Sequence, residues 1–479
     1  MKKLSLLAAV LLSLGFTACH EVDNPAPVVD DGRTTITLDG VQYKTDLVAT
    51  FTGKVGSEVS LTLGVYDRFD IYGVDFGDGE IIADTVCYQN GGLKDENGYT
   101  VKWRKSATKF TGTVAGDGIV KVYGNSNLWY IVATGGLCPT SLDQEKIVHA
   151  VQVSITGADV ENIELPAMAE LTKLTFNNSP LKTIDVSKAK ALTSLTINNS
   201  KESEYEPQLT AIDLSQNTEL AYLSITGNTK NPGKLTSIDL TKNTKLSGTG
   251  LYLQNNALTE VKLGENSLTT INLQNNKLTA LDTDKLSGLT HLYAANNELT
   301  TIDVSKMEKL VWLDVKNNQL EGALDLTPNK KLENIYVNDN QLTGLKVENG
   351  VKALYFDNNK MIFSTMPELP ASMNTSSKIK QFHFAPQNGV VKIALDFDEL
   401  DLTAETKKKG ILAEEADTKF RFFADDKELV EGTDYTGKDG KFTFLRVYDQ
   451  VYGVLTTDAY PEVEITTTKF AIKTKGTKN

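Results

Sequence analysis

Histidine, cysteine and proline are all scarce in this chain of 479 residues, which contains 4, 3 and 12 of them respectively. So few histidines are a thin supply for metal or acid–base chemistry, and neither a metal site nor a cofactor is expected. Basic residues are also outnumbered, because Lys and Arg total 49 against 62 Asp and Glu, a formal net charge of −13. A nucleic-acid binder needs a basic surface to meet phosphates, so this composition argues against a nucleic-acid partner.

Several well-known catalytic motifs are missing as well. The sequence contains no H-E-x-x-H, G-x-S-x-G, C-x-x-C, Walker A or G-x-G-x-x-G pattern. No catalytic residue is therefore predicted, and the chain is not expected to be an enzyme. A glycosidase with paired carboxylates is a less favoured alternative, because the sequence supplies carboxylates but no evident acid–base pair. Hydrophobic residues make up 40% of the chain and charged residues 23%, which makes a packed core feasible.

The N-terminal residues are predicted to form an export signal. An apolar run over 4–14 follows two lysines and is too short to span a bilayer, which is typical of a signal peptide over 1–18. The junction before Cys19 resembles the lipobox of bacterial lipoproteins, although Phe16 replaces the usual aliphatic residue. This resemblance implies that Cys19 is lipidated and becomes the first residue of the mature chain. A plain secretory signal with a nearby cysteine is the alternative.

Residues 19–33 are predicted to form a lipidated tether. From His20 to Asp31 this segment contains acidic residues and no Lys or Arg. Acidic residues after a lipidated cysteine resemble an outer-surface export signal of some bacteria with two membranes, and a merely soluble spacer is the alternative. We therefore predict a protein of the outer membrane that is lipid-anchored and faces the cell exterior, with the membrane as a partner through the lipid anchor.

Two cysteines remain after Cys19, namely Cys87 and Cys138. An even pair in a protein exported from the reducing cytosol is compatible with a disulfide. Two buried free thiols are the alternative, because the sequence does not say whether the two Cα atoms come within bonding range. The pair is a candidate disulfide on this basis.

The middle of the chain repeats one sequence template. Segments that begin at Leu268, Leu289, Leu310 and Leu332 follow the pattern L-x-x-L-x-L-x-x-N-x-L, with small departures. The pattern recurs about every 21 residues and resembles the short bacterial type of leucine-rich repeat, over about 171–360. Its asparagine position forms one series: Asn228, Asn256, Asn276, Asn297, Asn318, Asn340 and Asn359.

The template has a direct physical interpretation. In the Leu-x-Leu part the leucines are expected to point inward from a short strand, with the residues beside them pointing outward. One copy cannot bury its apolar face alone, whereas stacked copies share a continuous core. The asparagine is expected to turn inward and to satisfy turn backbone that would otherwise be buried without partners. We therefore predict a mainly β fold with a leucine-rich repeat solenoid, in which the asparagine series is structural.

Aromatic residues occupy outward strand positions of the repeats and alternate with polar ones. Exposed aromatic side chains among polar groups are typical of surfaces that recognise an extracellular protein, peptide or glycan. The indole of Trp312, in the middle of the row, is expected to face solvent. The alternative is that the rings only stabilise the strands through cross-strand contacts. The candidate ligand-binding face comprises Tyr222, Tyr252, His291, Tyr293, Trp312, Asp314, Tyr336, Asn338 and Tyr355.

The other side of the repeats carries a periodic aspartate. Stacked carboxylates repel one another, so these groups must be solvated, hydrogen-bonded to turn N–H groups or bound to a cation. The row comprises Asp185, Asp213, Asp239, Asp282, Asp303 and Asp325.

The flanks of the repeats are predicted to be rich in strands. Turn signals and alternating residues predict a β-sandwich-like domain over 34–118 and an immunoglobulin-like sandwich over 381–479. Degenerate capping repeats are expected over 119–170, and the solenoid with its C-terminal cap over 171–380. Residues 74–79, Val-Asp-Phe-Gly-Asp-Gly, resemble the core of polycystic-kidney-disease-type (PKD) sandwich domains, and a calcium site there is the alternative.

These features predict a surface-anchored binding or adhesion lipoprotein. The alternative is a structural spacer in an outer-membrane surface assembly, without a ligand of its own. Binding predicts an aromatic face that is open to a ligand, whereas a spacer predicts that protein contacts cover this face.

Overall fold

The computed structural model describes residues 33–65, 70–86, 107–125, 128–142, 150–157, 161–164, 168–199, 205–348, 350–368, 382–393, 399–409 and 415–473. Within these ranges the chain is mainly β, with short 3-10 turns and no α-helix. The described residues also contain no helix that is long and apolar enough to cross a membrane. The predicted signal peptide, Cys19 and Cys87 lie outside the described residues, and Cys138 is described only through its backbone.

The first of two compact units comprises Met1–Leu192 and Ser203–Tyr205. Its strands are β1 (Thr34–Leu38), β2 (Val41–Thr52), β3 (Glu58–Val65), β4 (Asp70–Asp75), β5 (Ile81–Val86), β6 (Thr108–Thr113), β7 (Ile119–Gly124), β8 (Leu128–Thr134), β9 (Cys138–Leu142), β10 (Gln152–Thr156), β11 (Asn162–Glu164), β12 (Lys173–Asn177) and β13 (Thr183–Asp185). One sheet has the order β1-β2-β7-β4-β5, with β9 against β2, and another runs β6-β3-β8-β10-β12.

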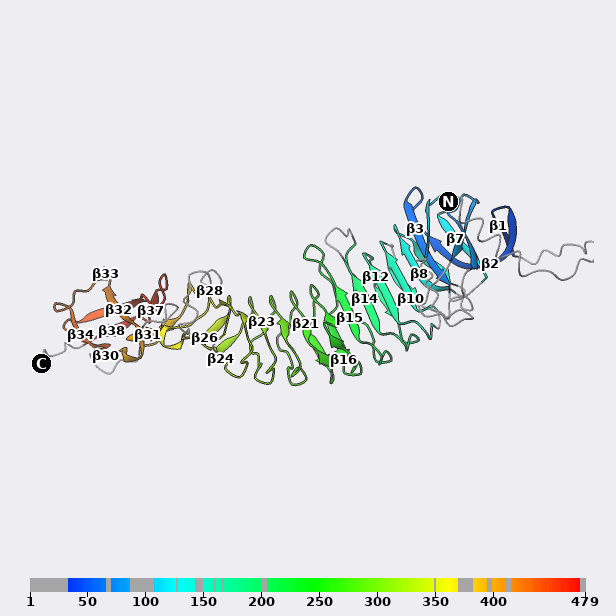
Figure 1. Cartoon of the computed structure of the whole chain (residues 1–479). Helices are drawn as coiled ribbons and strands as arrows, with labels where there is room; N and C mark the ends of the chain where they lie inside the picture. Colours follow the sequence, from blue (N-terminus) through cyan, green and yellow to red (C-terminus); the bar gives the residue numbers. More distant parts are fainter. Residues whose placement is uncertain are drawn as a thin grey trace, which may run out of the picture. The chain divides into compact units, whose positions relative to one another are not determined.

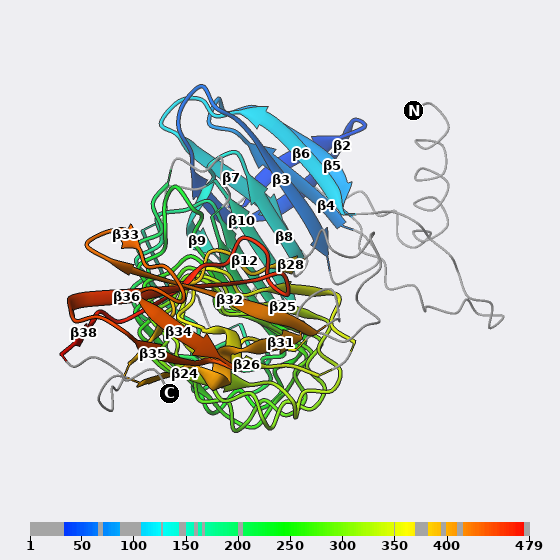
Figure 2. The same ribbon diagram turned by 90° about the vertical axis from the view of Figure 1, so that its left-hand side faces the viewer.

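In the second of these sheets the strand pairing changes from antiparallel to parallel at β8 (Figure 2). Strand β3 pairs antiparallel with both β6 and β8. From β8 onward the pairing is parallel, first with β10 and then between β10 and β12. The register aligns Ile131, Val153 and Leu174, and all three side chains are buried. Parallel stacking of the repeat kind therefore begins at β8.

The prediction that degenerate repeats begin at residue 119 is wrong. Val120 and Val122 lie in β7, which pairs antiparallel with β2 and β4 in the N-terminal sheet. Both side chains are fully buried there. An inward–outward alternation is common to a strand of any half-buried sheet and to a Leu-x-Leu repeat, so the sequence pattern alone could not separate the two.

The second compact unit comprises Thr193–Glu202 and Glu206–Asn479 and contains the clear repeats (Figure 1). Each turn of the repeat contributes one strand to a main sheet in which every neighbouring pair is parallel. In spatial order these strands are β14 (Ser194–Asn198), β15 (Tyr222–Thr226), β18 (Leu251–Tyr252), β21 (Thr270–Asn272), β22 (His291–Tyr293), β23 (Trp312–Asp314), β25 (Asn334–Tyr336), β27 (Ala353–Tyr355) and β28 (Phe382–His383).

Elsewhere in the repeats, short parallel pairs join other parts of successive turns, namely β16 with β19, β17 with β20, and β24 with β26. The bounds are β16 (Ser237–Leu240), β17 (Ser247–Gly248), β19 (Glu260–Leu263), β20 (Ser267–Leu268), β24 (Glu321–Asp325) and β26 (Gln341–Lys346). Between the two sides lie the leucines of the template, for example Leu251, Leu292 and Leu313, which are fully buried. The predicted leucine-rich repeat solenoid is confirmed.

The asparagine series turns inward at the end of the main-sheet strands. The Nδ2 amide of Asn297 donates to the carbonyl oxygens of Leu273 at 3.0 Å and of Ala294 at 3.1 Å, and its Oδ1 accepts from the backbone N–H of Leu278 at 3.0 Å. One side chain thus joins adjacent turns. The same inward donation recurs at Asn256, Asn276, Asn318, Asn340 and Asn359. Asn228 differs, because its Oδ1 accepts from the backbone N–H groups of Lys230 and Asn231 in a local loop.

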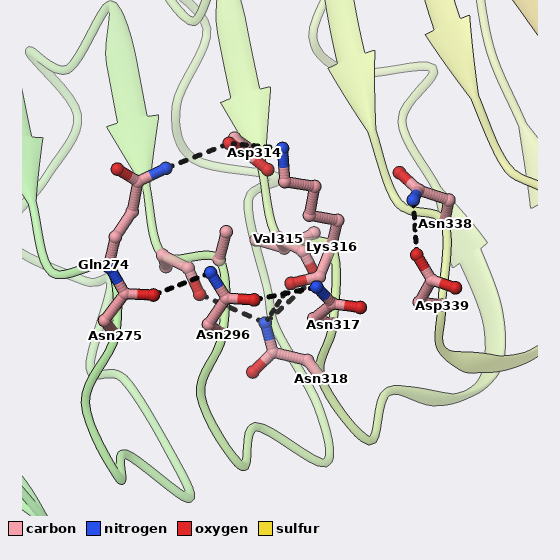
Figure 3. A network of polar contacts seen from close by, with 12 residues as sticks. Gln274, Asn275, Asn296, Asp314, Val315, Lys316, Asn317, Asn318, Asn338 and Asp339 are labelled. Atoms are coloured by element: carbon pink, nitrogen blue, oxygen red, sulfur yellow. Dashed lines mark hydrogen bonds and ion pairs between the residues drawn. The ribbon is translucent and has the colours of Figure 1, made fainter. Parts of the chain in front are cut away.

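A second ladder of asparagines runs beside the first, nearer the surface (Figure 3). Asn275, Asn296 and Asn317 adopt the left-handed backbone region, with φ of 57°, 57° and 51°. Asparagine tolerates this region better than most side chains, which suits it to the tight turn after each strand. Each Nδ2 donates to the Oδ1 of its counterpart one turn earlier at 2.7 Å, starting from Asn255.

The C-terminal part of the second unit is also built from strands. One sheet has the order β29-β37-β36-β32-β31, with β33 against β32 and β38 against β36, and a smaller one runs β30-β35-β34. A core of aromatic residues, including Phe422 and Phe444, is buried between these elements. The bounds are β29 (Val390–Val391), β30 (Glu399–Asp401), η4 (Thr403–Glu405), β31 (Lys407–Lys409), β32 (Glu415–Ala424), β33 (Lys427–Glu428), β34 (Tyr435–Lys438), β35 (Lys441–Phe444), β36 (Tyr448–Thr457), β37 (Ile465–Thr467) and β38 (Phe470–Ile472).

The last repeats pack directly against this C-terminal part. The ring of Tyr460 is fully buried and lies edge-on to Phe356, with 6.3 Å between the ring centroids. Its hydroxyl donates to the carbonyl oxygen of Pro367, just after the 3-10 turn η1 (Phe363–Thr365). The buried carboxylate of Glu405 accepts the backbone N–H of Ser364 at 2.9 Å. The C-terminal part therefore closes the apolar end of the solenoid.

The predicted boundary between residues 380 and 381 needs a correction. Strand β28, at 382–383, pairs parallel with β27 and so continues the main sheet of the repeats. Gln387 extends the same arrangement, because its Nε2 donates to the carbonyl oxygen of Phe356 at 2.8 Å. The solenoid thus includes residues beyond 380, which the sequence pattern did not reveal because residues 361–370 break the template.

Candidate functional site

The outward side chains of the main sheet form two rows, which together we call the strand face. The first row aligns Thr270, His291, Trp312 and Asn334 on neighbouring strands. Neighbouring strands lie about 4.8 Å apart, so side chains in one row touch their neighbours directly. The second row is Ser224, Tyr252, Asn272, Tyr293, Asp314, Tyr336, Tyr355 and His383.

Rings on the strand face stack on one another over several repeats. Trp312 stacks on Tyr336 with 5.2 Å between the ring centroids, and Tyr336 stacks on Tyr355 at 4.8 Å. The row ends at His383, whose ring lies 4.3 Å from that of Tyr355 with 12° between the planes. A separate pair, Tyr222 and Tyr252, lies farther along with 6.0 Å between its centroids. The tyrosines and Trp312 are half-buried, so this packing leaves part of each side chain open.

The indole of Trp312, which we expect to face solvent, is only partly exposed. Trp312 does occupy an outward position, but its ring lies 5.9 Å from Tyr293 on one side and 5.2 Å from Tyr336 on the other. The register places Asp314 between the same two tyrosines. The indole therefore fills the space at Asp314, and its Nε1 is buried without a hydrogen-bond partner among the described residues. The sequence could place the residue on a face but could not predict its rotamer.

Asp314 is the most enclosed charged group of the strand face, with an exposed fraction of 5%. Its Oδ2 accepts from Nε2 of Gln274 at 3.1 Å and lies 3.8 Å from Nζ of Lys316 (Figure 3). Its Oδ1 is buried and has no hydrogen-bond partner in the described part of the chain. Burial raises the pKa of Asp314, and the nearby Lys316 opposes that rise only in part.

Polar groups continue along the same edge of the strand face. The ammonium group of Lys316 lies 5.7 Å from the ring centroid of Tyr336, within the range of a cation–π contact. The side-chain amide of Asn338 donates to the carboxylate of Asp339. Burial is the main cause that raises the pKa of Asp357. Side-chain oxygens of Asn338 and Asp357 are buried without partners among the described residues. Such groups carry a desolvation cost, which a ligand or water can relieve.

The aspartate row on the other side of the repeats has a local structural use. Asp303 accepts the backbone N–H of Ser305 at 2.9 Å, and Asp239 accepts that of Thr241 at 2.9 Å. Hydrogen bonds from the side chain and the backbone N–H of Thr241 lower the pKa of Asp239, and those from the side chain and the backbone N–H of Ser305 lower the pKa of Asp303. Equivalent bonds from the residue two positions ahead occur at Asp185, Asp213, Asp282 and Asp325. The carboxylates therefore close turns, as one of the three sequence alternatives proposed.

The Val-Asp-Phe-Gly-Asp-Gly segment has a comparable role. Oδ1 of Asp75 accepts the backbone N–H groups of Gly77 at 2.8 Å and of Gly79 at 3.1 Å, which shapes the turn after β4. Both glycines have positive φ, 103° and 82°, where other residues are strained. Within the described ranges, no group of three His, Cys, Asp or Glu side chains could hold a metal ion.

Some residues of the strand face escaped the sequence analysis. His383 ends the ring row but lies in the segment that the sequence assigns to a separate C-terminal domain, although Phe382-His-Phe384 alternates like the template. Gln254 and Gln274 lie next to the second row and were missed because they are neither aromatic nor charged. Gln274 binds Asp314, and Oε1 of Gln254 is buried without a partner among the described residues.

No protein-family model matches the chain, and no curated protein does. Among solved structures, the functional domain of InlJ from Listeria monocytogenes is 18% identical, with 69% of this chain and 83% of that chain covered and a TM-score of 0.35. The leucine-rich repeat domain of APL1B is 18% identical, with coverage of 53% and 79% and a TM-score of 0.39. An internalin-like protein of Listeria monocytogenes is 18% identical, with coverage of 59% and 89% and a TM-score of 0.33. These scores are low, so the leucine-rich repeat fold rests on the chain's own repeats.

Proposed function

We propose that the chain is a lipid-anchored protein of the outer membrane whose strand face binds an extracellular protein, peptide or glycan. The observation that carries this proposal is the ring row over Trp312, Tyr336, Tyr355 and His383, with Tyr293 beside it, on the outward side of the main sheet. The solenoid core is complete without these rings, because the template leucines on the inward side are fully buried. Large aromatic side chains on an outward face are costly to expose and are enriched at binding hot spots.

The packing of the ring row also favours recognition. Each ring is held by its neighbours, as Tyr336 is between Trp312 and Tyr355. Side chains that are already ordered lose less conformational freedom when a ligand binds, so more of the contact energy appears as affinity. Asp314, Asn338 and Asp357 add hydrogen-bonding groups at the border of the rings, which a ligand could use for orientation.

The same stacking gives the spacer alternative its one specific support. Tyr336 has Trp312 against one side and Tyr355 against the other, so most of its ring face is already covered. Rings that only lock parallel strands together would have the same geometry. The two candidate functions therefore differ in whether the open edges and hydroxyls of the rings contact a partner.

An array of host glycoproteins and glycans, probed with the mature protein, separates these candidates. A variant that combines Tyr336→Ser with Tyr355→Ser removes the centre of the ring row, and a control that combines Asp303→Ala with Asp325→Ala changes the aspartate row instead. The proposal predicts that wild type and control bind the same spots and that the strand-face variant loses them. Equal binding by both variants would show that the strand face is scaffold.

A further inference from the structure

The second row of the strand face carries no ring at Asn272, between Tyr252 and Tyr293. The register pairs Tyr252 with Asn272 and Asn272 with Tyr293, so the two tyrosines lie two strands apart. Two inter-strand distances of about 4.8 Å separate their backbones by about 9.6 Å. The Oδ1 of Asn272 accepts the backbone N–H of Gln274 at 3.1 Å, which draws this side chain toward the end of its strand. We call this gap between two tyrosine rings the Asn272 notch.

The equivalent gap at Asp314 shows what such a notch can hold. Asp314 lies between Tyr293 and Tyr336 in the same row, two strands apart, and there the indole of Trp312 fills the space. The residue that corresponds to Trp312 on the strand of Asn272 is Thr270, which is too short to reach across. The consequence is visible in the exposure, because Asp314 is buried whereas Asn272 and Thr270 are only half-buried.

The walls of the Asn272 notch are held from behind. Tyr252 packs against Tyr222, with 6.0 Å between ring centroids, and Tyr293 packs against His291 and Trp312, at 6.3 Å and 5.9 Å. Neither wall needs to be ordered by a ligand, which lowers the entropic cost of binding.

The lining of the notch is polar and uncharged. Asn272 lies between Tyr252 and Tyr293 in the register of the second row, and Gln254 follows Tyr252 on the neighbouring strand segment. Oε1 of Gln254 is buried without a hydrogen-bond partner among the described residues, so it needs a donor. The charged groups Asp314 and Lys316 lie beyond Tyr293 and are already engaged with Gln274 and with each other.

We propose that the Asn272 notch binds a pyranose ring of a neutral glycan. This inference rests on the proposed function and names the class of its ligand. A six-membered sugar ring has the breadth of an indole, its C–H faces pack on aromatic rings, and its hydroxyls donate and accept along the rim. An aromatic side chain of a peptide also fits between two tyrosines, but it offers at most one donor to the amides and phenols of the notch. Charge does not decide the recognition, because the notch itself is neutral.

Saturation-transfer NMR with the mature protein tests this inference. The probes are glucose, galactose, mannose, fucose, N-acetylglucosamine and N-acetylgalactosamine, together with β-linked and α-linked oligomers of these sugars. The decisive variant is Thr270→Trp, which supplies an indole to the Asn272 notch in the way that Trp312 fills the notch at Asp314. The matched control is Thr301→Trp, which adds an indole at an exposed threonine beside the aspartate row and leaves the strand face unchanged.

We expect at least one of these sugars to receive saturation and its affinity to fall by about tenfold or more in Thr270→Trp. The Thr301→Trp control should keep the sugar bound at the Asn272 notch. Unfolding by denaturant should show that Thr270→Trp remains folded, since it reproduces a contact that the chain already makes elsewhere. If Thr270→Trp is unfolded, Asn272→Trp takes its place as the blocking variant.

Two results would overturn the inference. One is that none of the sugars receives saturation from the wild-type protein, and the other is that a bound sugar keeps its affinity when the notch is filled. The array can also yield a protein or peptide whose binding is lost with Tyr336→Ser and Tyr355→Ser but kept with Thr270→Trp. That result would leave the proposed function standing and would exclude a sugar in the Asn272 notch as the ligand. A ligand that keeps its binding in all of these variants would contradict both the inference and the proposed function.

Discussion

The indole of Trp312 stacks on the ring of Tyr336 across two adjacent strands, with 28° between the ring planes. It also touches Tyr293, and it lies 6.5 Å from the ring of His291. The residue at the centre of the candidate ligand-binding face is therefore also a packing residue. A change at this position alters the stability of the solenoid as well as any contact with a ligand.

Replacing Trp312 with alanine should lower the free energy of unfolding by about 1–3 kcal/mol, since aromatic pairs contribute beyond their buried area. Urea unfolding followed by circular dichroism measures the change. Tyr222→Ala is the matched control, because its recorded ring contact is with Tyr252, and it should cost clearly less. A loss within about 0.5 kcal/mol for Trp312→Ala would mean that the stacked arrangement contributes nothing.

Asp314→Asn should stabilise the protein at neutral pH. Burial raises the pKa of Asp314 above its ordinary value of 3.8, so the folded state binds the proton more tightly than the unfolded state does. Stability from this group is therefore highest below pH 3.8 and is lost as pH rises through the raised pKa. The asparagine variant should gain stability at pH 7, and the gain should disappear as the pH falls below 3.8.

Asp303→Asn should change the stability in the opposite direction at neutral pH. Hydrogen bonds from Ser305 lower the pKa of Asp303, so this carboxylate stabilises the fold above pH 3.8 and loses that effect under acid conditions. The variant should be slightly less stable than wild type at pH 7 and equal to it in acid. Denaturation curves of the two variants at several pH values check both signs. The same pH dependence of stability in both variants would contradict the burial of Asp314 or the hydrogen bonds to Asp303.

Asn297→Ala should destabilise the solenoid by about 2–4 kcal/mol, because it leaves several buried backbone groups without partners. These are the carbonyl oxygens of Leu273 and Ala294 and the N–H of Leu278. The adjacent Asn296→Gly is the control: Asn296 is exposed with φ of 57°, and glycine adopts this conformation freely. Equal losses in unfolding experiments would argue against the inward asparagines as the main polar support.

The repeat period, the inward leucines and the rows of the strand face could all be predicted from the sequence. Each depends on residues close in the chain, whose side-chain direction follows from strand geometry alone. The second asparagine ladder was also within reach. Asn255, Asn275, Asn296 and Asn317 each precede a template asparagine, and the repeated Asn-Asn pair indicates a turn residue with positive φ.

Other features depend on contacts between distant segments. The indole of Trp312 packs against both Tyr293 and Tyr336, the two tyrosines that flank Asp314 in the second row, and the strand pattern does not contain this contact. Val120 alternates like a repeat residue but pairs antiparallel with β2. Tyr460 closes the end of the solenoid from a domain far along the chain, where no local signal marks its partner Phe356.

Cys19→Ser should move the protein from the membrane fraction to the soluble fraction. The sequence before Cys19 resembles a lipobox, and the apolar run over 4–14 belongs to the segment that is removed, so the predicted lipid is what would hold the mature chain at the membrane. Fractionation followed by immunoblotting measures the distribution, with Ser13→Ala inside the signal peptide as a control that should stay membrane-bound. An unchanged membrane fraction for Cys19→Ser would exclude lipid anchoring at this residue.

Fluorine NMR of the mature protein labelled with 5-fluorotryptophan tests the role of the strand face most directly. The chain has 3 tryptophans, and Trp312→Phe assigns the resonance of the one on the strand face, while Trp103 and Trp129 act as internal references. On titration with a ligand from the glycoprotein and glycan array, the Trp312 resonance should shift in a saturable manner and the other two should stay in place. A saturated complex in which the Trp312 resonance does not move would contradict binding through the strand face.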